Sequence, residues 1–322
     1  MTATLRPATA AGARPSAPAT YESVLRDLAL ADERIVVLTA ENRAAIRGLP
    51  PHLGSRFIDV GIAEQTMIAM GAGLALRGRL PVMHALAAFL TMRAYEFIRT
   101  DIGLARLPGK LVGGVPGILS EANGPTHQAI EDIALMRTVP HMTIFCPADT
   151  RELLDALPAL LASPDPVYLR YIDRAPLTPH APRFTPGRAH VLTRGRDVAL
   201  LTYGAMLREC LDAAVLLEAA GLSVHLVDVR TLQPFDDDEL LEAASTTRLL
   251  VTVEDHIGTG GLATIVAERL VAHRARARLV AIHLEPGGFV PTLLPEALRT
   301  SGLNGEGIAR RVLDALTRHR PD

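Results

Sequence analysis

The residues around Glu64 are of the types that could activate a cofactor or move a proton. Residues 56–65 read Arg-Phe-Ile-Asp-Val-Gly-Ile-Ala-Glu-Gln. A short strand is predicted to end at Gly61, where the missing side chain lets another group approach, and Glu64 opens the next helix. Burial among its apolar neighbours would yield a carboxyl group that shares a proton near pH 7. The competing interpretation is a glutamate that only complements the helix dipole.

Two further side chains could bind a substrate. His127, in Gly-Pro-Thr-His-Gln, follows a predicted strand and precedes a predicted helix, and parallel sheets place ligands outside the carboxyl ends of their strands. Arg170, in Pro-Val-Tyr-Leu-Arg, carries a planar guanidinium group suited to a phosphate or carboxylate. On the residues alone, a surface histidine and a structural ion pair are the competing explanations.

The run at residues 56–65 closely resembles the cofactor-activating segment of transketolases, deoxyxylulose-phosphate synthases and related enzymes. Their pattern is an aspartate, an apolar residue, glycine, isoleucine, alanine and then the glutamate. The resemblance implies that Glu64 hydrogen-bonds the aminopyrimidine ring of thiamine diphosphate and favours its imino tautomer. The imino nitrogen then takes the proton from the thiazolium carbon. Glu64 is therefore expected to be catalytic and to bind the cofactor.

The resemblance extends over most of the chain in the same order. It implies that Phe89 stacks on the aminopyrimidine and that Tyr95 lies near the ring. Glu41 occupies the position where the family usually has an aspartate, one carbon shorter, that reaches the cofactor. His127 matches a histidine that faces the donor's reacting carbon and oxygen and is expected to be catalytic. Arg170 matches an arginine for the substrate's phosphate or carboxylate. Without the resemblance, the two aromatics would be interpreted as core residues of a helix.

Three positions depart from the family pattern. Asn123 stands four residues before His127, where transketolases carry an aspartate that recognises a sugar hydroxyl. Val115 occupies a place where full-length transketolases have another substrate histidine, and its side chain cannot hydrogen-bond a sugar. His84 appears where relatives have a small or apolar residue, so it either compensates as a substrate-binding residue or lies in the core. The substrate is therefore expected to differ from the usual one.

The family's diphosphate anchor is missing from this sequence. Full-length relatives hold magnesium and the diphosphate through Gly-Asp-Gly and a later asparagine, and no Gly-Asp-Gly occurs here. The resemblance therefore implies a separate partner, an N-terminal transketolase-like subunit that carries this segment. The expected assembly is a heterotetramer with two copies of each chain and active sites at the interfaces. Thiamine diphosphate and Mg²⁺ are the expected cofactors.

The elements that would position these residues alternate between strand and helix. This alternation predicts an α/β fold of two domains, each a mostly parallel sheet flanked by helices. We expect a loose tail over 1–20, a pyrimidine-binding domain over 21–175, a proline-rich linker over 176–190 and a C-terminal domain over 191–322. The predicted elements that carry the site residues are a strand at 56–60, a helix at 63–76, a helix containing Phe89 and Tyr95, a helix at 128–137 and a strand at 167–171.

Composition narrows the class of protein. The 322 residues are 48% hydrophobic and 21% charged, with a net charge of −2, so no global field would attract nucleic acid or an anionic membrane. The first twenty residues lack the apolar core of a signal peptide, and no apolar run is long enough to span a bilayer. The two cysteines form no metal-ligand pattern. We expect a cytoplasmic protein with buried free thiols.

Several functions fit these observations. The main expectation is transfer of a two-carbon ketol unit between a ketose and an aldehyde. The alternative within the same chemistry is decarboxylation of a 2-oxoacid with acyl transfer, as in deoxyxylulose-phosphate synthase or the beta subunit of 2-oxoacid dehydrogenases. A third possible function is that of a regulatory subunit that has kept the fold but not the activity. A weaker alternative is an NAD-dependent oxidoreductase, because Gly-Thr-Gly-Gly-Leu-Ala at 258–263, with Glu285 beyond it, resembles a dinucleotide-binding fingerprint.

Overall fold

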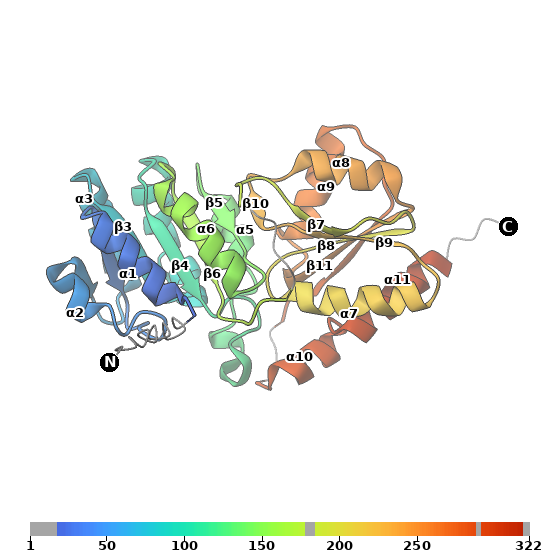
Figure 1. The fold of residues 1–322 in the computed structure, drawn as a ribbon, viewed down its shortest axis with the longest axis horizontal. Helices are drawn as coiled ribbons and strands as arrows, with labels where there is room; N and C mark the ends of the chain where they lie inside the picture. Colours follow the sequence, from blue (N-terminus) through green and yellow to red (C-terminus); the bar gives the residue numbers. More distant parts are fainter. Residues whose placement is uncertain (1–17, 178–183, 288–290, 318–322) are drawn as a thin grey trace, which may run out of the picture.

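In a computed structural model, the protein consists of two α/β units that lie side by side (Figure 1). The structure describes residues 18–177, 184–287 and 291–317, so most of the predicted tail and the centre of the predicted linker lie outside it. Within these ranges the strands form one sheet of seven and one sheet of five. Both sheets are mostly parallel, which confirms the predicted fold class.

The first sheet carries the predicted site residues at the carboxyl ends of its strands. Its order is β10-β5-β6-β4-β3-β1-β2, and only the edge strand β10 runs antiparallel to its neighbour. β10 comes from the part of the sequence expected to form the second domain, so the two units share a sheet edge. The strands are β1 (Ile35–Thr39), β2 (Phe57–Asp59), β3 (Leu80–Leu86), β4 (Lys110–Gly114), β5 (Thr143–Phe145), β6 (Val167–Tyr171) and β10 (Thr231–Gln233).

Helices cover both faces of the first sheet. α1 (Tyr21–Ala31) and α6 (Thr150–Ala162) pack on one face, where they share a core cluster with Val82 of β3. α3 (Glu64–Leu76) packs on the other face, in a cluster with Met83. Neighbouring residues of β3 thus point to opposite faces, as the pleat requires. A short helix, α2 (Pro50–Leu53), and a 3-10 turn, η1 (Gly54–Arg56), connect β1 to β2.

The predicted helix that contains Phe89 and Tyr95 has an unusual winding. It consists of a π-helical turn η2 (Phe89–Arg93), a short α4 (Tyr95–Phe97) and a second π-helical stretch η3 (Ile98–Leu104). Single π turns inside helices often occur at functional sites. The predicted helix at 128–137 starts later, as α5 (Asp132–Arg137), because Ala129 forms a β-bridge with Gly117. A 3-10 stretch η4 (Glu121–Thr126) precedes it.

The second sheet has the order β12-β11-β8-β9-β7, with β7 antiparallel at the edge. α7 and α11 pack on one face, and α8 and α9 pack on the other within the same apolar cluster as α3. The two units therefore share one continuous core. The elements are β7 (His190–Thr193), β8 (Val198–Thr202), β9 (Val224–Asp228), β11 (Leu249–Ile257), β12 (Leu279–Leu284), α7 (Met206–Ala219), α8 (Asp237–Thr246), α9 (Leu262–Ala272), α10 (Leu294–Ser301) and α11 (Gly305–Thr317).

Among the described residues, no helix has the length and apolar character that crossing a membrane requires.

Candidate active site

Glu64 lies at the start of α3, just beyond the carboxyl end of β2. The chain turns at Gly61, whose φ of 73° favours glycine, and Glu64 is only 1% exposed. Its Oε2 accepts a hydrogen bond of 2.7 Å from Nη1 of Arg93, whose side chain is 39% exposed. The predicted buried carboxyl group is therefore present, and it has a cationic partner that the sequence analysis did not identify.

Arg93 joins Glu64 to the two ring residues of the predicted site. Its guanidinium carbon lies 4.5 Å from the centroid of the Phe89 ring, and the His127 ring meets Phe89 edge-on at 5.1 Å between centroids. The π-helical turn brings Phe89 and Arg93 onto this common surface. Glu64, Arg93, Phe89 and His127 thus form a continuous chain of contacts, which we call the Glu64 cluster. A sequence signal for Arg93 existed, since it is the only charged residue between His84 and Glu96.

Asp59 organises the strand ends beside the Glu64 cluster. Its Oδ1 accepts hydrogen bonds from the backbone N–H groups of Gly61 at 2.9 Å and Glu41 at 3.3 Å, and its other oxygen pairs with Arg43. Burial alone would raise the pKa of Asp59, but these hydrogen bonds outweigh it and lower the pKa. Glu41 is exposed and has a φ of 58°, a strained value for a residue other than glycine. The predicted cofactor contact from Glu41 stays a prediction.

Tyr95 contacts the end of α5. Its hydroxyl group forms a hydrogen bond with Oγ1 of Thr138, at the end of α5, and its ring packs against the core shared with α3. Among the sequence-predicted cofactor residues, Glu64 and Phe89 are brought together, whereas Tyr95 faces α5.

The predicted substrate loop lies against the second unit. Asn123 is exposed and donates a weak hydrogen bond of 3.4 Å to Ser120, while His127 is half-buried, with its Nδ1 2.9 Å from Oγ1 of Thr126. A Cβ on Gly124 would lie 2.7 Å from Pro291, so only glycine allows this approach. Val115 has a φ of 54°, and a β-branched residue in this region is strained. Such strain often marks a functional site.

Arg170 does not face open space for a substrate. It is 3% exposed and bonds two buried carboxylates, Asp132 at 2.9 Å and Asp255 at 2.8 Å. The hydroxyl group of Tyr168 also donates to Asp132, at 2.6 Å. Asp132 belongs to the first unit and Asp255 to β11 of the second. The predicted substrate contact therefore gives way to a buried ion-pair network that fastens the two units together.

His84 lies in the core and not among the substrate residues. It is 2% exposed, and its Nε2 is 2.8 Å from the hydroxyl group of Tyr21. It lies two residues beyond Val82 on β3, so it points to the α1 and α6 face, opposite the cluster under α3. The expectation that His84 binds substrate is corrected, because the alternation of the strand directs it away from Glu64.

The burial of His84 makes the stability of the fold depend on pH. Burial lowers the pKa of His84 from 6.5 to about 4, against the smaller effect of its backbone hydrogen bonds. Between these values the unfolded chain binds a proton that the folded chain does not, so stability is full above pH 6.5 and falls as the pH drops. We expect a loss of about 3 kcal/mol between pH 6.5 and pH 4. The free energy of unfolding in urea should fall less between pH 6.5 and pH 4 for His84→Gln than for the wild type. An equal fall in both proteins would contradict this role of His84.

The glycine-rich turn at 258–263 is closed by the protein itself. Oε2 and Oε1 of Glu254 accept hydrogen bonds from the backbone N–H groups of Leu262 at 2.6 Å and Ala263 at 2.9 Å, at the start of α9. Burial raises the pKa of Glu254 to about 8. A Cβ on Gly261 would lie 2.1 Å from this carboxyl group. The amides that would bind a dinucleotide's pyrophosphate are therefore occupied by Glu254, which disfavours the oxidoreductase alternative.

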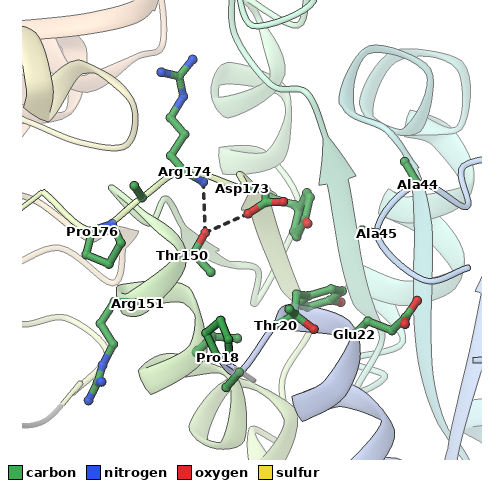
Figure 2. A pocket seen from close by; sticks show the side chains of 15 residues that line it. Pro18, Thr20, Glu22, Ala44, Ala45, Thr150, Arg151, Asp173, Arg174 and Pro176 are labelled. Carbon is green, nitrogen blue, oxygen red and sulfur yellow. Dashed lines mark hydrogen bonds between the residues drawn. The ribbon is translucent and has the colours of Figure 1, made fainter. Parts of the chain in front are cut away.

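A cavity of about 840 Å³ lies apart from the Glu64 cluster, between the starts of α1 and α6 (Figure 2). Thr150 stands within it and hydrogen-bonds Asp173 at 3.1 Å and the backbone N–H of Arg174 at 3.0 Å. Its lining contains none of the sequence-predicted site residues: Pro18, Ala19, Thr20, Tyr21, Glu22, Ala44, Ala45, Thr150, Arg151, Leu154, Tyr171, Asp173, Arg174, Ala175 and Pro176. This cavity is therefore separate from the predicted active site.

Comparison with protein families matches both units. Residues 14–175 match the pyrimidine-binding domain of transketolase, and residues 187–308 match the transketolase C-terminal domain. The chain is 38% identical to a 6-deoxy-6-sulfo-D-fructose transketolase subunit of Clostridium sp. (strain MSTE9) over 255 residues, 78% of this chain and 79% of that protein. It is also 34% identical to 1-deoxy-D-xylulose-5-phosphate synthase of Symbiobacterium thermophilum over 309 residues, 94% of this chain but 47% of that protein.

A solved structure agrees with these matches. The fold resembles a structure described as a split-gene transketolase in an inactive beta4 tetramer, with a TM-score of 0.81 and 34% identity. The similarity covers 92% of this chain and 97% of that one. The chain therefore belongs to the transketolase family of thiamine diphosphate-dependent transferases, within which it resembles the subunit of a split enzyme that carries the pyrimidine-binding and C-terminal domains.

Proposed function

We propose that this chain, together with a separate N-terminal subunit, transfers a two-carbon ketol unit from a ketose to an aldehyde. The observation that carries the proposal is the buried carboxyl group of Glu64, held beside the Phe89 ring at the carboxyl edge of a parallel sheet. A relative named as a transketolase subunit and a solved structure described as a split-gene transketolase support the division into two chains. His127, which contacts Phe89, is the residue proposed to face the reacting atoms of the donor.

The Glu64 cluster fits the aminopyrimidine end of thiamine diphosphate. That ring is flat and needs one carboxyl partner and one apolar surface, and Glu64 and Phe89 supply these two groups. When bound, the cofactor would supply the nucleophilic carbon that accepts the two-carbon unit. Glu64 would hold the proton that its ring shares, and burial would keep water from competing for that hydrogen bond. Mg²⁺ and the diphosphate are assigned to the partner, because the sequence lacks Gly-Asp-Gly.

An exposed apolar surface beside Glu64 supports the presence of a partner. Ile62, on the approach to α3, is 75% exposed, and Met70 and Leu76, on the solvent-exposed part of α3, are 38% and 72% exposed. Met92 and Leu104, on the π-helical run that packs against α3, are also exposed. Exposed apolar side chains along a helix that begins with the proposed catalytic carboxyl group are typical of an interaction site. We propose that the N-terminal subunit covers this surface, in a heterotetramer.

Co-expression of this chain with a subunit of the same genome that carries Gly-Asp-Gly tests the proposal. The purified complex should transfer two carbons from a ketose to an aldehyde without releasing carbon dioxide, and neither subunit alone should do so. The second candidate is decarboxylation of a 2-oxoacid with carbon–carbon bond formation, favoured by the 34% identity to deoxyxylulose-phosphate synthase. Release of carbon dioxide from a 2-oxoacid, with no ketol transfer, would establish it instead.

Asn123 is the position where we expect donor specificity to change. It is exposed beside His127 and presents a neutral amide where transketolases carry a charged acceptor. Hydrogen bonds to charged groups are stronger than neutral ones, so Asn123→Asp should raise kcat/KM for donors with a hydroxyl group next to the transferred unit by about tenfold. Asn123→Ala, which has no acceptor, is the control and should not improve. An unchanged donor profile in Asn123→Asp would show that this position does not read the donor.

A further inference from the structure

Arg93 contacts both groups that are proposed to receive the cofactor's ring. Its Nη1 donates a hydrogen bond of 2.7 Å to Glu64, and its guanidinium carbon lies 4.5 Å from the centre of the Phe89 ring. One side chain therefore occupies the carboxyl partner and the stacking surface at the same time. The proposed function gives Arg93 no role.

The guanidinium group resembles the ring that would replace it. It is flat, donates N–H bonds to a carboxylate and stacks on aromatic faces. In its imino tautomer, whose ring N–H faces the carboxylate, the aminopyrimidine has the same three properties. We propose that Arg93 is a placeholder, a positioning residue that holds Glu64 and covers Phe89 in the cofactor-free chain and moves aside when the aminopyrimidine enters. This inference rests on the proposed function.

A placeholder is needed because Glu64 is deeply buried before the cofactor arrives. The residue is 1% exposed, and its neighbours Ile62 and Ala63 offer no charged partner. A carboxylate taken from water without a cation is strongly destabilised. Arg93 supplies the missing partner and so keeps the carboxyl group in the orientation that the cofactor needs.

The surroundings of Arg93 allow it to leave. Its side chain is 39% exposed and is paired with one carboxylate, whereas Arg170 is 3% exposed and is held by two. The long flexible stem of an arginine can carry the charged end into water without moving the backbone. Arg170 is thus fixed between the units, whereas Arg93 can be displaced.

Removal of Arg93 tests the inference. In the assembled complex, with Mg²⁺ present, calorimetric titration with thiamine diphosphate should show Arg93→Met binding about tenfold more tightly than the wild type, since no residue has to be displaced. The midpoint of thermal unfolding should fall in the cofactor-free variant and match the wild type when the cofactor is saturating. Arg99→Met is the matched control, because Arg99 is exposed on the same helical run. It should change neither quantity.

Different outcomes separate this inference from the proposed function. Weaker cofactor binding in Arg93→Met, or an equal loss of stability with and without cofactor, would overturn the placeholder. If the wild-type complex binds no thiamine diphosphate, the proposed function fails and the placeholder with it. The isolated chain offers an independent measurement: Glu64→Gln should recover the stability that Arg93→Met removes, and purely additive losses would show that the two side chains are not coupled.

Discussion

We expect Glu64→Gln in the assembled complex to abolish exchange of the thiazolium proton of bound thiamine diphosphate and to lower turnover by at least about a thousandfold. Proton transfer by a positioned side chain contributes roughly a hundredfold to ten-thousandfold to a rate, and the amide cannot give up or take a proton. Because glutamine has nearly the same size, the buried site should stay packed. Deuterium exchange followed by NMR after acid quench measures the loss directly.

The control for this variant is Glu96→Gln, which removes the same charge from an exposed position on α4. It should exchange the proton and turn over at the wild-type rate. Gel filtration of both variants with the partner should show the same assembly as the wild type. Normal exchange of the thiazolium proton in Glu64→Gln would contradict the proposed role of Glu64 in activating the cofactor, whether or not the complex assembles.

The second large effect is expected at Arg170. Arg170→Met leaves the carboxylates of Asp132 and Asp255 buried without their cation, and breaking a buried ion pair in this way destabilises a protein by about 3–5 kcal/mol. Asp132 already has one oxygen with no hydrogen-bond partner among the described residues. Since the network joins the two units, the loss should appear in the free energy of unfolding measured with urea.

Arg106→Met provides the comparison for Arg170. Arg106 pairs with Asp165 through a side chain that is 60% exposed, and such pairs contribute at most about 1 kcal/mol. The same experiment decides between the two interpretations of Arg170. If Arg170→Met kept its stability and instead raised the KM of the donor strongly, the substrate contact implied by the family resemblance would be correct and the structural assignment would fall.

The family resemblance implies a role for each site residue, and the structure shows which of these residues lie together. Glu64, Phe89 and His127 lie on loops or helix starts at one edge of a sheet, and the structure brings these three together. Tyr95 and Arg170 match the family motif in sequence but point to other partners here. A motif specifies a position along the chain, whereas the direction of a side chain depends on the winding and packing around it.

The sequence by itself determined the features that depend on neighbouring residues. Alternating apolar runs and helical patterns led to the α/β class, and β6 has the bounds that its pattern predicted. The glycine at position 61 and the apolar residues around Glu64 were enough to place that carboxyl group at a helix start. These properties arise from backbone propensity and periodicity over a few residues.

Only the tertiary structure decided the features that depend on residues far apart in the chain. Arg170 acquires partners 38 and 85 residues away, and Glu254 closes a turn eight residues further on. β10 leaves the second unit to join the first sheet, and the face to which His84 points follows from the strand's place in that sheet. Glu64 meets Arg93, 29 residues later, through a π-helical turn. Such pairings depend on which surfaces the fold brings together, and short-range sequence patterns carry no information about them.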